Sequence, residues 1–242
     1  MAVGFEELDF KQTPMGDLVL RRRQLLSLGN REVYEVILGD AFLMSSLFTV
    51  VEEALADLGL AAVEAEQGAA LQVVVGGLGL GYTAQATLRE SRVGELVVID
   101  TMAEVIGWHE QGLVPLGEEL SQDPRCRFIH ADFFACASDP ATGFDPDSPG
   151  RRFHAILLDI DHSPRKILDP SHADFYTPGG LARLKEQLIP GGVFAMWSDD
   201  PPEEDFLELL RGVFTDEVRA EVVTFSNPLQ ERDSASTVYV AR

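Results

Sequence analysis

Compact apolar runs alternate with helix-like stretches along most of the chain. Five runs lack polar alternation and are bounded by Gly, Pro or acidic residues, which predicts strands buried on both faces. They are Leu71–Val75, Glu95–Ile99, Cys126–Ile129, Phe153–Leu158 and Gly192–Trp197. Apolar residues at helical spacing predict helices at Thr83–Glu90, Met102–Glu110, Thr177–Leu188 and Glu203–Phe214. Strands that alternate with helices are typical of a parallel sheet covered on both faces.

The first sixty residues follow a different pattern. Two short runs, Asp17–Leu26 and Arg31–Leu38, are separated by Gly29-Asn30. This pair favours positive φ, so the segment predicts a β-hairpin. Apolar residues at helical spacing from Leu47 to Leu58, with Gly59 as the stop, predict one amphipathic helix after it.

Two further segments complete the pattern. Glu217–Phe225 and Ser236–Ala241 are rich in strand-forming residues and predict an antiparallel pair at the edge of the sheet. Asp139–Arg152 is rich in Asp, Pro, Ser and Gly, which predicts a surface loop.

Composition limits the kinds of partner. The chain has 242 residues, 45% hydrophobic and 24% charged, which suits one folded domain with a substantial core. Its 40 acidic and 19 basic residues give a net charge of −21, which repels nucleic acid and anionic membranes. We therefore expect a small-molecule substrate and no nucleic-acid or membrane partner. Such a charge attracts polyamines and other cations, although many soluble proteins are acidic only for solubility.

The cysteines and the amino terminus indicate the compartment. Cys126 and Cys136 have no His or Cys neighbours at metal-ligand spacing, so structural thiols in a reducing compartment are expected. Met1–Phe10 carries acidic residues where a secretory signal has basic ones, and later windows lack the length of a membrane helix. The sequence predicts a cytoplasmic protein.

A glycine-rich turn follows the first buried strand. Gly77, Gly79 and Gly81 form a G-x-G-x-G pattern between a strand and a helix. Glycine permits positive φ and close approach of a ligand, and the helix amino terminus presents free N–H groups. The same pattern also fits a tight turn with no ligand.

Two aspartates at the next strand ends favour a nucleoside. Asp100 can accept bonds from ribose hydroxyls, and Asp132 from an adenine amino group. Each could instead cap the following helix. A nicotinamide-dinucleotide fingerprint, G-x-G-x-x-G, does not match, because the third glycine falls two residues after the second, and Thr83, two positions beyond Gly81, is not glycine. We therefore expect an adenosyl sulfonium donor, S-adenosylmethionine or its decarboxylated form.

Further motifs accompany this turn. They are Asp100 followed by residues 104–106, the segment 130–132, the segment 158–164, and the pair 175–176 followed by the segment 188–192. Together they resemble the spermidine synthase family and its methyltransferase-like relatives over about half of the chain. The resemblance implies a transferase with an α/β fold, a Rossmann-like, mostly parallel seven-stranded sheet of the S-adenosylmethionine-methyltransferase type with a small N-terminal β-hairpin and helix. It implies an appendage at residues 1–60, a nucleoside-binding catalytic domain at residues 61–242, and a homodimer.

The resemblance carries roles only where the motifs match. It places the ribose on Asp100, the adenine near Asp132 and the attacking amine at Asp159. The family's acid in the glycine loop is replaced by Leu80, and its second acid after the fourth strand by His162, with Asp161 adjacent. The family's Gln and Tyr-His-Glu cluster is replaced by Leu38–Met44. Polyamine specificity does not follow from these positions.

Transfer from a sulfonium requires an uncharged nucleophile aligned with the electrophilic carbon. We expect Asp159 to take or steer the proton of an amine, and Asp161 or His162 to hold the substrate's other polar end. Alternatively, Asp159 and Asp161 cap the turn before Ser163-Pro164.

Three functions stay open on the sequence. The first is aminopropyl transfer to an amine, supported by Asp159 and the acidic surface. The second is methyl transfer to a small molecule, supported by Leu80, because the loss of an acid would relieve repulsion with a donor carboxylate. In a metal-assisted form of the second function, Asp159, Asp199 and Asp200 would bind Mg²⁺. A helix cap before Pro201-Pro202 explains Asp199 and Asp200 better, so no metal is predicted. The third is a non-catalytic nucleoside-binding module.

Overall fold

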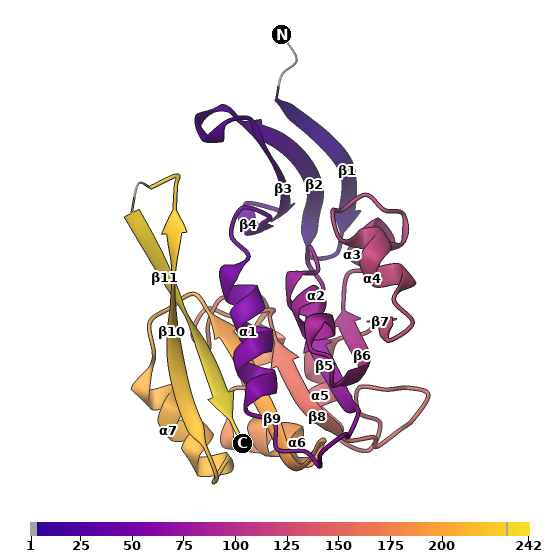
Figure 1. The fold of residues 1–242 in the computed structure, drawn as a ribbon, viewed down its shortest axis with the longest axis vertical. Coiled ribbons are helices and arrows are strands. Elements are labelled where there is room, and N and C mark those ends of the chain that lie inside the picture. Colours follow the sequence, from indigo (N-terminus) through magenta and orange to yellow (C-terminus); the bar gives the residue numbers. More distant parts are fainter. Residues whose placement is uncertain (1–3, 231) are drawn as a thin grey trace.

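A seven-stranded sheet forms the centre of the computed structural model, which describes residues 4–230 and 232–242 (Figure 1). Its strand order is β10-β11-β9-β8-β5-β6-β7. The strands are β5 Leu71–Gly76, β6 Val93–Asp100, β7 Cys126–His130, β8 Phe153–Leu158, β9 Leu188–Ser198, β10 Val218–Asn227 and β11 Arg232–Ala241. β5 to β9 are parallel, whereas β10 and β11 form an antiparallel pair on β9. The predicted Rossmann-like class is confirmed.

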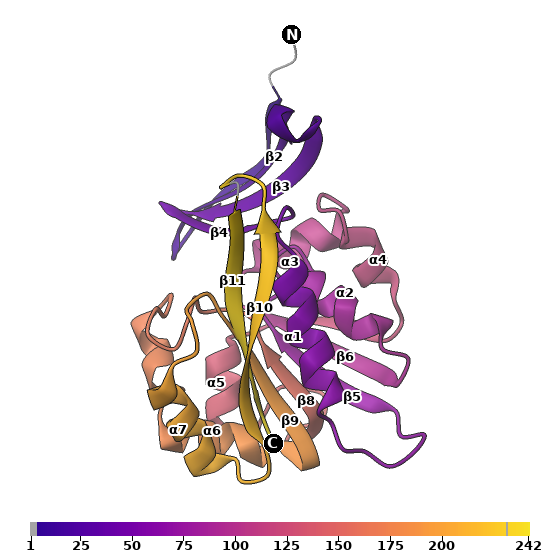
Figure 2. The same cartoon turned by 60° about the vertical axis from the view of Figure 1, so that its left-hand side comes forward.

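Helices cover both faces of this sheet (Figures 1 and 2). One face carries α1 Val50–Ala61, α2 Tyr82–Arg89, α3 Ala103–Glu110 and α4 Gly117–Gln122, and the other α5 Phe133–Ser138, α6 Pro178–Glu186 and α7 Glu204–Val213. Alternate residues of each strand point to opposite faces, so the two layers have separate apolar cores. Val73 and Val75 face the first core, and Val74 faces the second.

A four-stranded antiparallel sheet stands above the carboxyl edge of the larger sheet (Figure 1). Its strands are β1 Phe5–Thr13, β2 Gly16–Leu25, β3 Arg31–Leu38 and β4 Ala41–Ser45. The predicted hairpin is β2–β3, and its turn places Gly29 at φ 69° and Asn30 at φ 64°. The sequence did not indicate β1 and β4. In Figure 2 the β10–β11 hairpin rises beside this small sheet.

Most predicted elements are present with shifted ends. All five buried strands, the four helices and the edge pair are found, but β9 begins earlier, at Leu188, and includes 190–192 in an irregular stretch. The short helices α4 and α5 were not predicted. α1, which the sequence grouped with the hairpin, packs on β9 and β11 of the larger sheet. Residues 1–3 of the predicted appendage lie outside the described residues.

Both cysteines are free, as predicted, and burial raises the pKa of Cys126 to about 12. Among the described residues, no helix is both long enough and apolar enough to cross a membrane.

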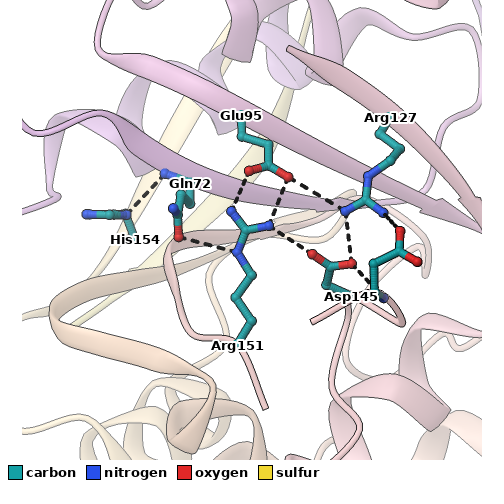
Figure 3. Close-up of polar contacts among 7 residues, drawn as sticks. Gln72, Glu95, Arg127, Asp145, Arg151 and His154 are labelled. Atoms are coloured by element: carbon teal, nitrogen blue, oxygen red, sulfur yellow. Dashed lines mark hydrogen bonds and ion pairs between the residues drawn. The ribbon is translucent and has the colours of Figure 1, made fainter. Parts of the chain in front are cut away.

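The loop 139–152 crosses the amino edge of the sheet and is fixed there by ion pairs (Figure 3). It contains no regular element, as predicted, yet Phe144 and Asp145 within it are almost completely buried. Arg151 donates to both Glu95, on β6, and Asp145, each at 2.8 Å through Nη1. Arg127, on β7, reaches Asp145 Oδ1 at 2.9 Å. The prediction of a surface loop is therefore wrong at these anchors, because two arginines offset the cost of burying the acid.

Candidate functional site

A cavity of about 530 Å³ lies between the carboxyl edge of the seven-stranded sheet and the four-stranded sheet. Its floor comes from the segments that follow β5, β6, β7 and β8, and its other walls from β3, β4, α1 and the β10–β11 hairpin. The order of the strands reverses between β5 and β8, and ligands of open α/β sheets bind at such a point. The segments after these two strands bring Gly77 and Asp159 together there.

The glycine turn has the conformation that its residues predict. Gly77, at φ 93°, lies so close to Asp159 that a Cβ there would collide with the Asp159 carbonyl oxygen. Gly79, at φ 46°, faces the thioether of Met44. Both line the cavity, whereas Gly81 is buried and forms the N-cap of α2. Two of the three predicted glycines therefore face the ligand space, and the third sets the start of the helix.

Asp100 supports this turn from the end of β6. It is 7% exposed, and its Oδ2 accepts the Leu78 N–H at 2.9 Å while Oδ1 accepts the Met102 N–H at 2.8 Å. Burial raises the pKa of Asp100, and these backbone bonds counteract only part of the shift. A carboxylate has about four acceptor sites, so Asp100, which lines the cavity, retains capacity for a hydroxyl donor.

Asp132 lies after β7 and fits both of the roles considered for it. Its Oδ1 accepts the N–H groups of Phe134 at 2.8 Å and Ala135 at 3.2 Å, which makes it the N-cap of α5. The residue is also exposed and lines the cavity beside Phe133 and Phe134. A ligand can therefore reach its carboxylate without breaking the cap.

Asp159 directly follows β8, and among the described residues no lysine or arginine pairs with it. Its Oδ2 accepts the Thr83 hydroxyl at 2.7 Å, and burial raises its pKa to about 6. The carboxylate of Glu52, in the first turn of α1, lines the same cavity. Burial, with repulsion from Asp159, raises the pKa of Glu52 to about 8. Near neutral pH the Glu52 carboxyl is therefore largely protonated and the Asp159 carboxyl largely ionised, so the pair carries about one proton.

The sequence did not identify Glu52. In the helix 50–61 it reads as one of two acids, Glu52 and Glu53, in a first turn, where acids are common for electrostatic reasons. Glu53 does bond to Arg89, at 3.0 Å, as such a surface acid should. Only the packing of α1 over the end of β8 separates their roles.

Asp161 and His162 point to different places. Asp161 is 1% exposed and absent from the cavity lining, and its carboxylate accepts from Tyr176 Oη and pairs with His172 Nδ1, both at 2.8 Å. It also accepts the Leu168 N–H at 2.7 Å. Asp161 therefore fixes the 161–176 segment, whereas His162 lines the cavity near Trp197. Of the two, His162 is placed to touch a substrate.

The structure also places Leu80 and the two aspartates of the Mg²⁺ hypothesis, Asp199 and Asp200. Leu80 is completely buried in the core and does not line the cavity. The lack of an acid at this position therefore does not change the charge next to a bound donor. Asp199 lines the cavity, but Asp200 pairs with Lys166. Within residues 4–230 and 232–242, no three His, Cys, Asp or Glu side chains gather as a metal site would require.

The cavity lining is rich in acids. Its lining includes six carboxylates and, among the described residues, no lysine or arginine. The carboxylates are Glu52, Asp100, Asp132, Asp159, Asp169 and Asp199. Such a lining attracts cations and repels anionic ligands.

Two solved spermidine synthases have the same fold as this chain. One, crystallised with the transition-state analogue AdoDATO, superposes with a TM-score of 0.71 and 16% identity over 97% of this chain and 73% of that one. The other, from Thermotoga maritima, gives a TM-score of 0.69 and 15% identity over 97% and 71%. No protein-family model matches the sequence, and neither does any curated protein. The chain therefore has a spermidine synthase-like fold of the methyltransferase type.

Proposed function

We propose that the protein transfers the aminopropyl group of decarboxylated S-adenosylmethionine to an amine, with Asp159 as the residue that takes the amine's proton. The observation that carries this proposal is the carboxyl pair of Asp159 and Glu52 in a cavity that no described lysine or arginine lines. An acid without a cationic partner costs stability, which a cationic ligand would offset.

The donor half of the proposal rests on the glycine turn and two aspartates. Gly77 and Gly79 leave room for a ligand against the backbone, and Asp100 presents its carboxylate beside them. Asp132, with the phenylalanine rings that follow it, offers an acceptor and an apolar surface for a base. The analogue AdoDATO in the solved spermidine synthase supports a donor of this class.

The chemistry follows from the charge of Asp159. With a pKa of about 6, it is largely ionised at pH 7 to 8, and it can take a proton from a bound ammonium. The freed nitrogen lone pair then forms the new C–N bond while the C–S bond breaks, and its electrons leave on a neutral thioether. Thr83 keeps the Asp159 side chain oriented through the hydroxyl bond to Oδ2.

The decarboxylated donor is favoured over S-adenosylmethionine itself. The intact donor adds a carboxylate, which the acidic lining repels, and no described lysine or arginine of the cavity could pair with it. The argument from Leu80 for methyl transfer no longer applies, because that side chain is in the core.

Titration calorimetry with both donors tests the proposal. We expect decarboxylated S-adenosylmethionine to bind at least tenfold more tightly than S-adenosylmethionine, and a mass spectrum to show an aminopropylated amine with 5′-methylthioadenosine. Tighter binding of the carboxylated donor with a methylated product would instead support methyl transfer. Binding of both donors without any product would support a nucleoside-binding module.

A further inference from the structure

The four-stranded sheet closes the cavity with an apolar wall. Its strands and turns contribute Met15, Val36, Leu38, Phe42, Leu43 and Met44 to the lining. Phe42 is 48% exposed and Met15 is 40% exposed, although both are large apolar side chains. From β1 to β4, the one polar side chain in the described lining is Ser45.

Three aromatic residues extend this wall beside the carboxyl pair. Phe48, which precedes α1, lies with its ring 5.8 Å from that of Phe225 on the β10–β11 hairpin. Trp197, at the end of β9, lies 6.4 Å from the ring of His162. The rings come from segments far apart in sequence, and they line the same cavity as the acids, so only the tertiary fold brings the two together.

The acids of the cavity come from the larger sheet, its helices and the segments that follow its strands. Asp100 ends β6, Asp132 follows β7, and Asp169 lies in the 161–176 segment. Glu52 lies in the first turn of α1, Asp159 follows β8, and Asp199 is exposed directly after β9. The apolar wall itself carries no described carboxylate that could receive a second ammonium.

We propose, as an extension of the proposed function, that the acceptor is a primary monoamine with an apolar alkyl or aryl body. Its nitrogen lies at Asp159 and Glu52, and its body lies against Phe42, Phe48 and the rest of the apolar wall. A linear diamine would place its second ammonium on this wall, where no described carboxylate offsets the loss of its hydration. Each CH₂ buried there contributes about 0.8 kcal/mol, which is about a threefold to fourfold gain per group.

Steady-state rates with decarboxylated S-adenosylmethionine and a series of amines test this inference. The series comprises butylamine, hexylamine, 2-phenylethylamine and 1,4-diaminobutane. We expect kcat/KM to rise about tenfold from butylamine to hexylamine, and 2-phenylethylamine to exceed the diamine at least tenfold. A diamine that reacts faster than every monoamine overturns the inference but leaves the proposed function in place. If the donor binds and none of the amines reacts, both proposals fail.

A pair of phenylalanine variants locates the acceptor body. Phe42 and Phe10 are similarly exposed on the four-stranded sheet, at 48% and 44%, but only Phe42 lines the cavity. We expect Phe42→Ala to raise the KM for hexylamine about tenfold and to leave donor affinity unchanged, whereas Phe10→Ala changes neither. Equal effects of the two variants, or a loss in donor affinity with Phe42→Ala, would contradict the placement of the acceptor.

Discussion

Acids at the two edges of the seven-stranded sheet have pKa values shifted in opposite directions. At the amino edge, bonds from Arg151 lower the pKa of Glu95, and bonds from Arg151 and Arg127 outweigh burial and lower that of Asp145 (Figure 3). At the carboxyl edge, burial raises the pKa of Asp159, and burial with mutual repulsion raises that of Glu52.

The difference shows which acids serve the fold and which serve a ligand. The amino-edge acids pair with arginines of the same chain. Removing one acid would leave an arginine charge without its partner. The carboxyl-edge acids have no described arginine or lysine beside them in the cavity, so the folded protein is less stable for keeping them ionised. Such a loss of stability is typical of a functional site, where a bound ligand supplies the charge that pairs with the acids. The comparison yields three predictions.

The largest effect is on turnover at the carboxyl edge. We expect Asp159→Asn to lower kcat roughly a thousandfold, because the amide cannot take a proton. Donor affinity should stay within about threefold, and stability at pH 8 should rise, since a strained charge is removed. Steady-state kinetics, donor calorimetry and thermal unfolding measure the three quantities.

Asp57→Asn is the matched control for this change. Asp57 is exposed on α1 and does not line the cavity, so its variant should match the wild type in all three measurements. Full activity of Asp159→Asn would show that the proton is taken elsewhere.

The next effect is on stability at the amino edge. We expect Asp145→Asn to lower the free energy of unfolding by about 3 kcal/mol, because Arg151 and Arg127 lose a shared buried acid. Donor affinity should not change. Urea unfolding is the measurement, with Asp147→Asn as the control.

Asp147 also pairs with Arg127, at 2.7 Å, but its side chain is 80% exposed. Its loss should cost less than about 1 kcal/mol. If the two variants unfold at the same urea concentration, the ion pairs of Figure 3 do not anchor the loop.

The smallest effect is in the pH dependence of stability. In the unfolded chain Glu52 and Asp159 titrate near pH 4, whereas in the folded protein their pKa values are about 8 and 6. The unfolded state therefore binds fewer protons, and stability falls as the pH rises from about 4 to about 8. Glu52→Gln should remove much of this loss, with a gain on the order of 2 kcal/mol at pH 8.5 and almost none at pH 5.

The amino-edge acids should behave in the reverse sense. Their lowered pKa values give stability that is present above about pH 4 and is lost on further acidification. Glu53→Gln, in the same helical turn as Glu52, provides a control, since Glu53 pairs with Arg89. A gain at pH 8.5 for Glu53→Gln as large as that for Glu52→Gln would refute the coupling of Glu52 with Asp159.

The elements that the sequence predicted are those with strong periodicity. The buried strands and the edge pair have runs of apolar or β-branched residues long enough to be distinguished from their surroundings. β1 was missed because its apolar residues, Phe5, Leu8 and Phe10, do not alternate regularly with polar ones and none of them is fully buried, and α4 and α5 have only six residues each. Short or exposed elements leave little periodic signal.

The sequence by itself determined the fold class and the floor of the site. The strand pattern requires a parallel sheet, the glycines require a tight turn after β5, and acids at successive strand ends must share one edge. These features depend on residues close together in the chain.

Only the tertiary structure separated the acids by role. It brought Glu52 into the same cavity as Asp159, turned Asp161 towards His172 and Tyr176, and covered the site with the apolar side of a second sheet. The sequence alone does not show whether an arginine pairs with a given carboxyl group in the folded protein. Its charge state depends on neighbours that are distant in the chain, and these are set by packing alone.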